Sequence, residues 1–197
     1  MEGISRNSAA AALAALKKAG IAVVQTPEAW TLTDIALKVT QVAQAIGAPQ
    51  SGVALNVQMK KRLEAAVENG QKKRIAFLYL RGGSAIYLIG GKESGADSLI
   101  SAIGSIDVGA QRFSNPFTAM TSESILELNP EIILVMSKGL ESVGGVKGLI
   151  SLPGIAQTDA GANERIIAVD DSLLLSFGPR TPNLLNRLSA AVQRMAK

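Results

Sequence analysis

Two residue types that carry much of protein chemistry are missing from this chain of 197 residues: it contains no cysteine and no histidine. The lack of cysteine excludes disulfides, thiolate metal sites and thiol nucleophiles. The lack of histidine excludes histidine-dependent catalytic triads and histidine-ligated metals. Enzyme mechanisms and metal sites that require cysteine or histidine are therefore excluded for this chain.

Other features are scarce. Aromatic residues make up 4% of the chain, and no apolar run reaches the roughly 18 residues that a membrane-spanning helix needs. The net charge is +4, and the basic clusters at 60–62 and 72–74 contain no interleaved aromatic residues, so nucleic-acid binding has little support. The first five residues have neither the charged start nor the apolar stretch of a signal peptide. As written, the polypeptide is expected to stay in the cytoplasm.

What the chain has in abundance is aliphatic sequence. Hydrophobic residues make up 47% of it, which is typical of an Ala-, Leu-, Ile- and Val-rich α/β protein. The apolar patterns predict helices over 8–19, 31–47, 51–69, 94–103, 121–128, 144–151 and 181–195, strands over 21–24, 74–81, 85–89, 131–136 and 165–170, and an irregular loop over 112–120. In the helix over 51–69, one side is expected to be apolar, with Val53, Val57, Leu63 and Val67.

The segment from Arg74 to Gly83 is predicted to be a central buried strand that carries candidate binding residues at its end. It is a run of large apolar residues that stops at a double glycine, as a buried strand does at an open edge. Tyr79 and Arg81 are two residues apart, so they are expected on one face at the carboxyl end of this strand, where open α/β sheets bind ligands. A nearby guanidinium stabilises a phenolate, which is an anionic ligand that suits ferric iron. The alternative is that Tyr79 is a core residue and Arg81 a surface charge.

Four stretches, in their order and spacing, carry a resemblance to a known family. They are 79–83 (Tyr-Leu-Arg-Gly-Gly), 129–136 (Asn-Pro-Glu-Ile-Ile-Leu-Val-Met), 139–146 with 152–155 (Gly-Leu-Glu-Ser-Val-Gly-Gly-Val and Leu-Pro-Gly-Ile), and 177–182 (Phe-Gly-Pro-Arg-Thr-Pro). From about residue 5 to its end, the chain resembles the C-terminal part of the haem-binding protein of a bacterial haemin ABC importer. Such proteins belong to class III, the helical-backbone group of periplasmic binding proteins.

The resemblance implies an α/β fold with three parts. Residues 71–197 would form a doubly wound, Rossmann-like C-terminal lobe, and residues 49–70 the long backbone helix that connects the two lobes in this family. Residues 1–48 would be a helix–strand–helix remnant of the N-terminal lobe, whose preceding portion is absent from the chain. The resemblance implies a binding protein and not an enzyme.

The resemblance also implies roles for particular residues. The transported ligand would be ferric haem (haem b), with Tyr79 as the axial iron ligand and Arg81 holding it as phenolate. Met136 is expected against the porphyrin edge, unless it only fills the core, and Arg180 at a haem propionate, unless it pairs with a surface acid. Glu123 is expected to dock into arginine pockets of the permease, although the helix dipole alone favours an acid in a first helical turn. No histidine is available as a second axial ligand.

The implied partners are haem, the ABC permease subunits and cell-surface haem-binding proteins. In this family such proteins act outside the cytoplasm, in the periplasm or lipid-anchored at the cell surface. The alternatives are a class III binding protein for a corrinoid or a ferric siderophore, or a truncated fragment that binds no ligand. An α/β enzyme is less favoured, because Gly144 and Gly145 lack the spacing of a phosphate-binding loop and no acidic pair is spaced for catalysis.

Overall fold

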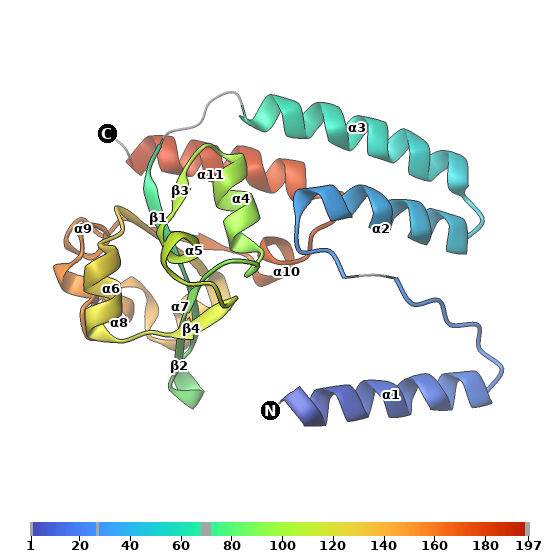
Figure 1. Cartoon of the computed structure of the whole chain (residues 1–197), viewed down its shortest axis with the longest axis horizontal. Coiled ribbons are helices and arrows are strands. Elements are labelled where there is room, and N and C mark those ends of the chain that lie inside the picture. The colour runs from blue at the N-terminus through green and yellow to red at the C-terminus, as the bar shows by residue number, and fades with distance from the viewer. Residues whose placement is uncertain (1, 27, 68–71, 196–197) are drawn as a thin grey trace.

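The computed structural model describes residues 2–26, 28–67 and 72–195, in which an α/β lobe is joined to long helices (Figure 1). The helices are α1 (Glu2–Lys18), α2 (Leu32–Ala45), α3 (Pro49–Val67), α4 (Ala96–Ala102), α5 (Val108–Arg112), α6 (Ser122–Leu128), α7 (Ser137–Ser142), α8 (Gly145–Ile150), α9 (Asp159–Ala162), α10 (Asp171–Leu174) and α11 (Thr181–Met195). The strands are β1 (Arg74–Arg81), β2 (Ile86–Gly90), β3 (Ile106–Asp107), β4 (Phe117–Ala119), β5 (Ile132–Met136) and β6 (Ile166–Val169). Two short 3-10 helices are η1 (Gly82–Ser84) and η2 (Ile155–Gln157).

One sheet forms the centre of the lobe. Among the described residues its strands follow the order β4-β2-β1-β5-β6, with β3 paired to the start of β1. β1, β5 and β6 run parallel, while β1 and β2 form an antiparallel hairpin. The register pairs Leu78 of β1 with Val135 of β5, and Val135 with Ala168 of β6. The carboxyl ends of three neighbouring strands therefore meet at one edge of the sheet.

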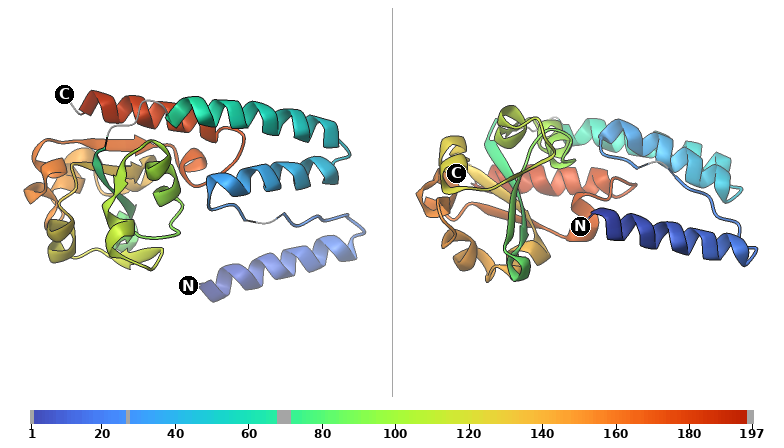
Figure 2. Two further views of the ribbon diagram at one scale, coloured as in Figure 1. Left: turned by 45° about the horizontal axis from the view of Figure 1, so that its top comes forward. Right: turned by 60° about the horizontal axis from the view of Figure 1, so that its bottom comes forward.

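Helices lie on both sides of this sheet (Figures 1 and 2). Because alternate residues of a strand point to opposite faces, Phe77 packs in a core with Leu99 of α4 and Leu185 of α11. The next residue, Leu78, packs in the other core with Ile125 of α6. Burial on both faces explains why β1 and β5 read as continuous apolar runs. The predicted doubly wound α/β arrangement is confirmed.

The segment before α2 differs from the prediction. α1 lies apart from the lobe in Figure 1 and in the left view of Figure 2, and an extended connection leads from it to α2. Ile21 and Val24 on this connection are 52% and 61% exposed, and residues 21–24 form no strand. The prediction of a buried strand was wrong, because no other strand of the described chain lies beside it to satisfy its backbone hydrogen bonds.

The side of α3 that is buried also differs from the prediction. A Cβ added to Gly52 would lie 2.5 Å from a side-chain carbon of α2, so the two helices approach closely at this glycine. Gly52 and Met59 are buried, whereas Val53 and Val57 are 59% and 53% exposed. Of the residues predicted for the apolar side, Leu63 packs against the core as expected, whereas the two valines do not. Val67, also predicted for the apolar side, lies outside the residues whose side chains are described.

Several short elements were not predicted. The expected loop over 112–120 contains β4, which extends the sheet by pairing with β2. α5, α7 and α10 each start directly after a strand or one residue later. None of the described helices combines the length and the apolar character that are needed to cross a bilayer.

Candidate functional site

Tyr79 and Arg81 lie side by side at the carboxyl end of β1, as their spacing predicts. Arg81 Nε donates a hydrogen bond of 2.5 Å to Tyr79 Oη, and the guanidinium carbon lies 5.2 Å from the centre of the phenol ring. Tyr79 is half-buried and Arg81 is exposed. A guanidinium in this position pairs with the negative charge that a phenol oxygen carries when it coordinates a metal cation.

The orientation of the Tyr79 ring depends on the loop over 112–120. Phe117 in β4 packs against Tyr79 with ring centroids 5.7 Å apart and an interplanar angle of 61°. Phe117 also packs against Phe77, at 6.4 Å. Phe113, the other phenylalanine of this loop, packs with the core on the opposite face of the sheet. Phe117 is therefore the aromatic residue of this loop that supports Tyr79.

A cavity of about 490 Å³ opens at this edge of the sheet. It is lined by Tyr79, Leu80, Arg81, Gly83, Ser84, Met136, Lys138, Gly139, Ser142 and Asp171. Since Leu78 is paired with Val135, the next residues, Tyr79 and Met136, are level on neighbouring strands. The structure therefore brings Tyr79, Arg81 and Met136 to one cavity, and their roles in binding stay predictions.

Hydrogen bonds join the walls of this cavity. Gly82 N donates to Ser142 Oγ at 2.9 Å, which links the end of β1 to α7. Lys138 N donates to Asp171 Oδ1 at 2.9 Å, which links α7 to α10. A Cβ on Gly82 would lie 2.0 Å from Ser142 O, so this approach of the two walls requires glycine. These hydrogen bonds thus fix the residues that follow β1, β5 and β6 relative to one another.

The charged residues that line this cavity are Arg81, Lys138 and Asp171. The Arg81 guanidinium is bonded to Tyr79, and the Asp171 carboxylate accepts the backbone N–H of Lys138. Within the described part of the chain, the Lys138 ammonium has no hydrogen bond or ion pair. Two cations against one carboxylate give the cavity a positive balance, which suits an anionic ligand.

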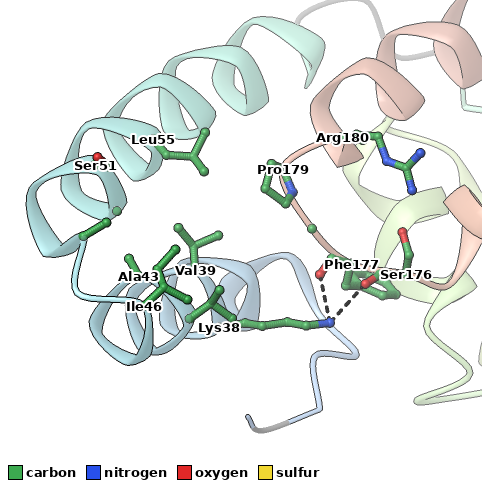
Figure 3. Close-up of a pocket in the computed structure, with 14 residues that line it drawn as sticks. Lys38, Val39, Ala43, Ile46, Ser51, Leu55, Ser176, Phe177, Pro179 and Arg180 are labelled. Carbon is green, nitrogen blue, oxygen red and sulfur yellow. Dashed lines mark hydrogen bonds between the residues drawn. The ribbon is translucent and has the colours of Figure 1, made fainter. Parts of the chain in front are cut away.

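Arg180 lies at a different cavity, of about 420 Å³, between α2, α3 and the segment that leads into α11 (Figure 3). The lining is mainly apolar, with Val39, Ala43, Leu55 and Pro179 among its residues (Figure 3). Arg180 Nη2 donates a hydrogen bond of 3.2 Å to the backbone oxygen of Ser172. Arg180 does not line the Tyr79 cavity, but Ser172 directly follows Asp171, which does. Hydrogen bonds from Ser172, together with the charges of Lys138 and Arg180, lower the pKa of Asp170.

Glu123 is exposed in the first turn of α6, away from both cavities. Thr121 is the N-cap of this helix and Ser124 completes a capping box, so the helix begins as predicted. A hydrogen bond from the backbone N–H of Glu123, together with one from the Thr121 side chain, lowers the pKa of the Glu123 carboxyl. The lobe therefore presents an exposed, ionised carboxylate at this helix terminus.

Within the residues that the structure describes, no group of three or more Asp, Glu, His or Cys side chains could hold a metal ion. A lone phenol oxygen at Tyr79 suits the axial position of a metal that another chelator already holds.

Sequence reasoning missed Lys138 and Asp171. A signal was present, because each follows two residues after a buried strand, Lys138 after β5 and Asp171 after β6. Parallel strands deliver such residues to one edge of a sheet. Which of them share a cavity depends on the strand order, which sequence patterns do not give.

Relatives match nearly the whole chain. Residues 4–173 match the sequence model of a family described as "Periplasmic binding protein". Among curated proteins, the uncharacterized ABC transporter substrate-binding lipoprotein YvrC of Bacillus subtilis (strain 168) is 24% identical over 193 residues, which are 95% of this chain and 59% of that protein. The chain therefore spans less than two thirds of the length of this relative.

Similar solved structures include three heme-binding proteins. Periplasmic heme-binding protein RhuT from Roseiflexus sp. RS-1, in apo form, has a TM-score of 0.88 and 37% identity over 94% of this chain and 72% of its own. Periplasmic heme-binding protein BhuT, in complex with two hemes, has a TM-score of 0.84 and 27% identity over 95% of this chain and 72% of its own. Heme binding protein HmuT has a TM-score of 0.81 and 31% identity over 91% of this chain and 60% of its own.

Proposed function

This chain belongs to the periplasmic binding protein family, and we propose that it binds ferric haem for an ABC-type haem import system. Its relatives are substrate-binding transport proteins and not enzymes. The observation that carries the proposal is the Tyr79–Arg81 pair at the edge of a positively charged cavity. A tyrosine oxygen is a known axial ligand of haem iron, and cations in the wall suit the haem propionates.

The relatives support haem as the ligand. RhuT, BhuT and HmuT are described as heme-binding proteins. Two HmuT structures carry alanine in place of a tyrosine and of an arginine two positions later in that protein, which is the spacing of Tyr79 and Arg81. A third carries alanine in place of a histidine, a residue type that this chain lacks. In the proposed site, Tyr79 is the axial ligand and Arg81 supports its negative charge.

Two other predicted contacts differ in how well they fit this site. Met136 lines the cavity level with Tyr79, and we include it as a contact of the porphyrin edge. Arg180 does not line the Tyr79 cavity and donates to Ser172 O, and its contact with a propionate stays a prediction.

Delivery to a permease is the second part of the proposal. Glu123 presents an exposed carboxylate at the start of α6, and a lowered pKa keeps it ionised. Such a group suits an arginine pocket on a partner. In this proposal residues 71–197 form one lobe, residues 49–70 the connecting helix and residues 1–48 part of a second lobe. The site of action is extracytoplasmic, in line with the family description and the lipoprotein relative.

A haem titration of three proteins tests the proposal. The wild type, Tyr79→Phe and Tyr87→Phe are titrated with ferric haem while the visible spectrum is recorded. Tyr87 is the matched control, because it is the other tyrosine of the chain and packs with the core on the opposite face of the sheet. The wild type and Tyr87→Phe are expected to give a saturable spectrum with a phenolate-to-iron charge-transfer band, and Tyr79→Phe to lose that band.

Two results would contradict the proposal. One is a wild-type spectrum that shows no saturable change. The other is the same charge-transfer band in Tyr79→Phe as in the wild type, which would place the iron ligand elsewhere.

A further inference from the structure

A haem bound at Tyr79 brings two propionate carboxylates, and carboxylates in a protein site are commonly paired with cations. Of the cations near this site, Arg81 is already bonded to Tyr79 Oη. Arg180 lies at the other cavity with its guanidinium on Ser172 O. Among the described residues that line the Tyr79 cavity, the remaining cation is Lys138.

Lys138 lies just past the carboxyl end of β5, the strand next to β1. Tyr79 and Met136 are level at the ends of β1 and β5. Arg81 follows Tyr79 by two residues, and Lys138 follows Met136 by two residues. Lys138 lies in the first turn of α7, directly after β5, and lines the same cavity as Arg81. Of these two cations, Arg81 is engaged with the phenol, and Lys138 is not.

The backbone of Lys138 is fixed while its ammonium is available. Lys138 N donates to Asp171 Oδ1, which ties the start of α7 to α10. The Lys138 side chain is exposed and, within the described part of the chain, makes no hydrogen bond or ion pair. After the hydrogen bonds from Ser172, its charge helps to lower the pKa of the nearby Asp170 carboxyl. Substituting the side chain leaves the backbone N–H and its hydrogen bond in place. Lys138 is therefore a cation that can be removed without removing a support of the fold.

We propose that Lys138 pairs with a propionate carboxylate of the bound haem and makes the site selective for porphyrins with free carboxylates. This inference rests on the proposed function, because it needs haem bound at Tyr79. An exposed ion pair has a modest effect, so removing Lys138 is expected to weaken haem binding roughly two- to fivefold at low salt. Screening reduces the effect as the ionic strength rises.

The experiment compares two ligands on three proteins. The wild type, Lys138→Ala and Lys147→Ala are each titrated with ferric protoporphyrin IX and with its dimethyl ester, at low and at high salt. Lys147 is the matched control, because it is an exposed lysine on α8 that does not line the Tyr79 cavity. Lys138→Ala is expected to lose affinity for the free acid at low salt and to match the wild type for the dimethyl ester. Lys147→Ala is expected to match the wild type for both.

The possible results separate this inference from the function on which it rests. If the wild type shows Tyr79-dependent haem binding and Lys138→Ala binds the free acid equally well at low salt, the inference is wrong and the proposed function stands. If the affinity of Lys138→Ala falls by the same factor for the free acid and for the dimethyl ester, Lys138 does not recognise carboxylates, and the inference is also wrong. If the wild type shows no Tyr79-dependent haem spectrum, the proposed function fails and the inference fails with it.

Discussion

Arg81 Nε lies 2.5 Å from Tyr79 Oη, while the same guanidinium lies over the phenol ring at 5.2 Å from its centre. The two residues are separated by one residue of β1, so the strand itself holds them on one face. Each side chain limits the rotation of the other, because the hydrogen bond and the cation–π contact hold the two groups together. The iron ligand of the proposed site is thus oriented by a neighbour on its own strand.

Replacing Arg81 by alanine is expected to weaken haem binding about tenfold. A hydrogen bond to a charged group contributes roughly 1.5–3 kcal/mol, and the exposure of Arg81 favours the lower end of that range. Arg81→Lys keeps the charge but not the planar donor geometry, so its haem affinity is expected to lie between those of the wild type and Arg81→Ala. Titration with ferric haem measures the affinity and the position of the charge-transfer band. Arg187→Ala is the control, because it removes an arginine outside this cavity. Equal haem affinities for Arg81→Ala and the wild type would contradict the prediction.

Phe117 is expected to matter for both stability and haem binding. Phe117→Ala removes the edge-to-face contact with Tyr79, and loss of this pair and of apolar burial is expected to cost about 2 kcal/mol of unfolding free energy. The ring of Tyr79 loses its support, so haem affinity should fall while the charge-transfer band remains. Urea unfolding and haem titration measure the two effects. Phe113→Ala serves as the control, since it should reduce stability through the opposite core and leave haem affinity unchanged.

Alanine substitution is expected to have very different effects at the two adjacent glycines that follow β1. A Cβ on Gly82 would lie 2.0 Å from the backbone oxygen of Ser142, whereas a Cβ on Gly83 would meet no atom within 4 Å. Gly82→Ala must therefore push β1 and α7 apart, at a cost of roughly 1–3 kcal/mol, and should also impair haem binding by opening the cavity wall. Gly83→Ala should leave the stability unchanged. Urea midpoints and haem titrations that are indistinguishable for the two variants would contradict this account of the wall.

Asp107 is expected to make stability depend on pH. It is 5% exposed, its Oδ1 accepts the N–H of Ala110, and its Oδ2 has no hydrogen-bond partner within the described chain. Burial, reinforced by the charge of Asp97, raises the pKa of the Asp107 carboxyl from 3.8 to about 7. The folded chain therefore keeps this proton over a range in which the unfolded chain has lost it. The stability contributed by Asp107 is fully present below about pH 4 and is lost as the pH rises to about 7.

Asp107→Asn tests this dependence. Asparagine can still cap α5 but carries no charge, so the variant should lack the decline between about pH 4 and pH 7, which amounts to at most about 4 kcal/mol in the wild type. Urea unfolding at several pH values measures the difference between the two proteins. Glu164→Gln, which removes an exposed carboxylate, should keep the wild-type slope. A parallel pH profile for Asp107→Asn and wild type would contradict the assignment.

The sequence by itself determined the features that depend on neighbours along the chain. The apolar runs over 74–81 and 131–136 predict strands buried on both faces, and Thr121 predicts the start of α6, because burial patterns and helix caps are local. The proximity of Tyr79 and Arg81 is also local, since two strand residues at this spacing share a face.

The tertiary structure alone decided what depends on strand order and on packing between distant elements. Lys138, Asp171 and Phe117 reach the Tyr79 region because β5 lies beside β1, β6 beside β5, and β4 beside β2. The predictions that failed have the same cause. Residues 21–24 had the composition of a strand without a partner strand, and α3 had several apolar residues of which the close approach of α2 selected only some. The pattern of apolar residues along the chain indicates which residues can be buried. Which of them are buried depends on the elements that pack beside them.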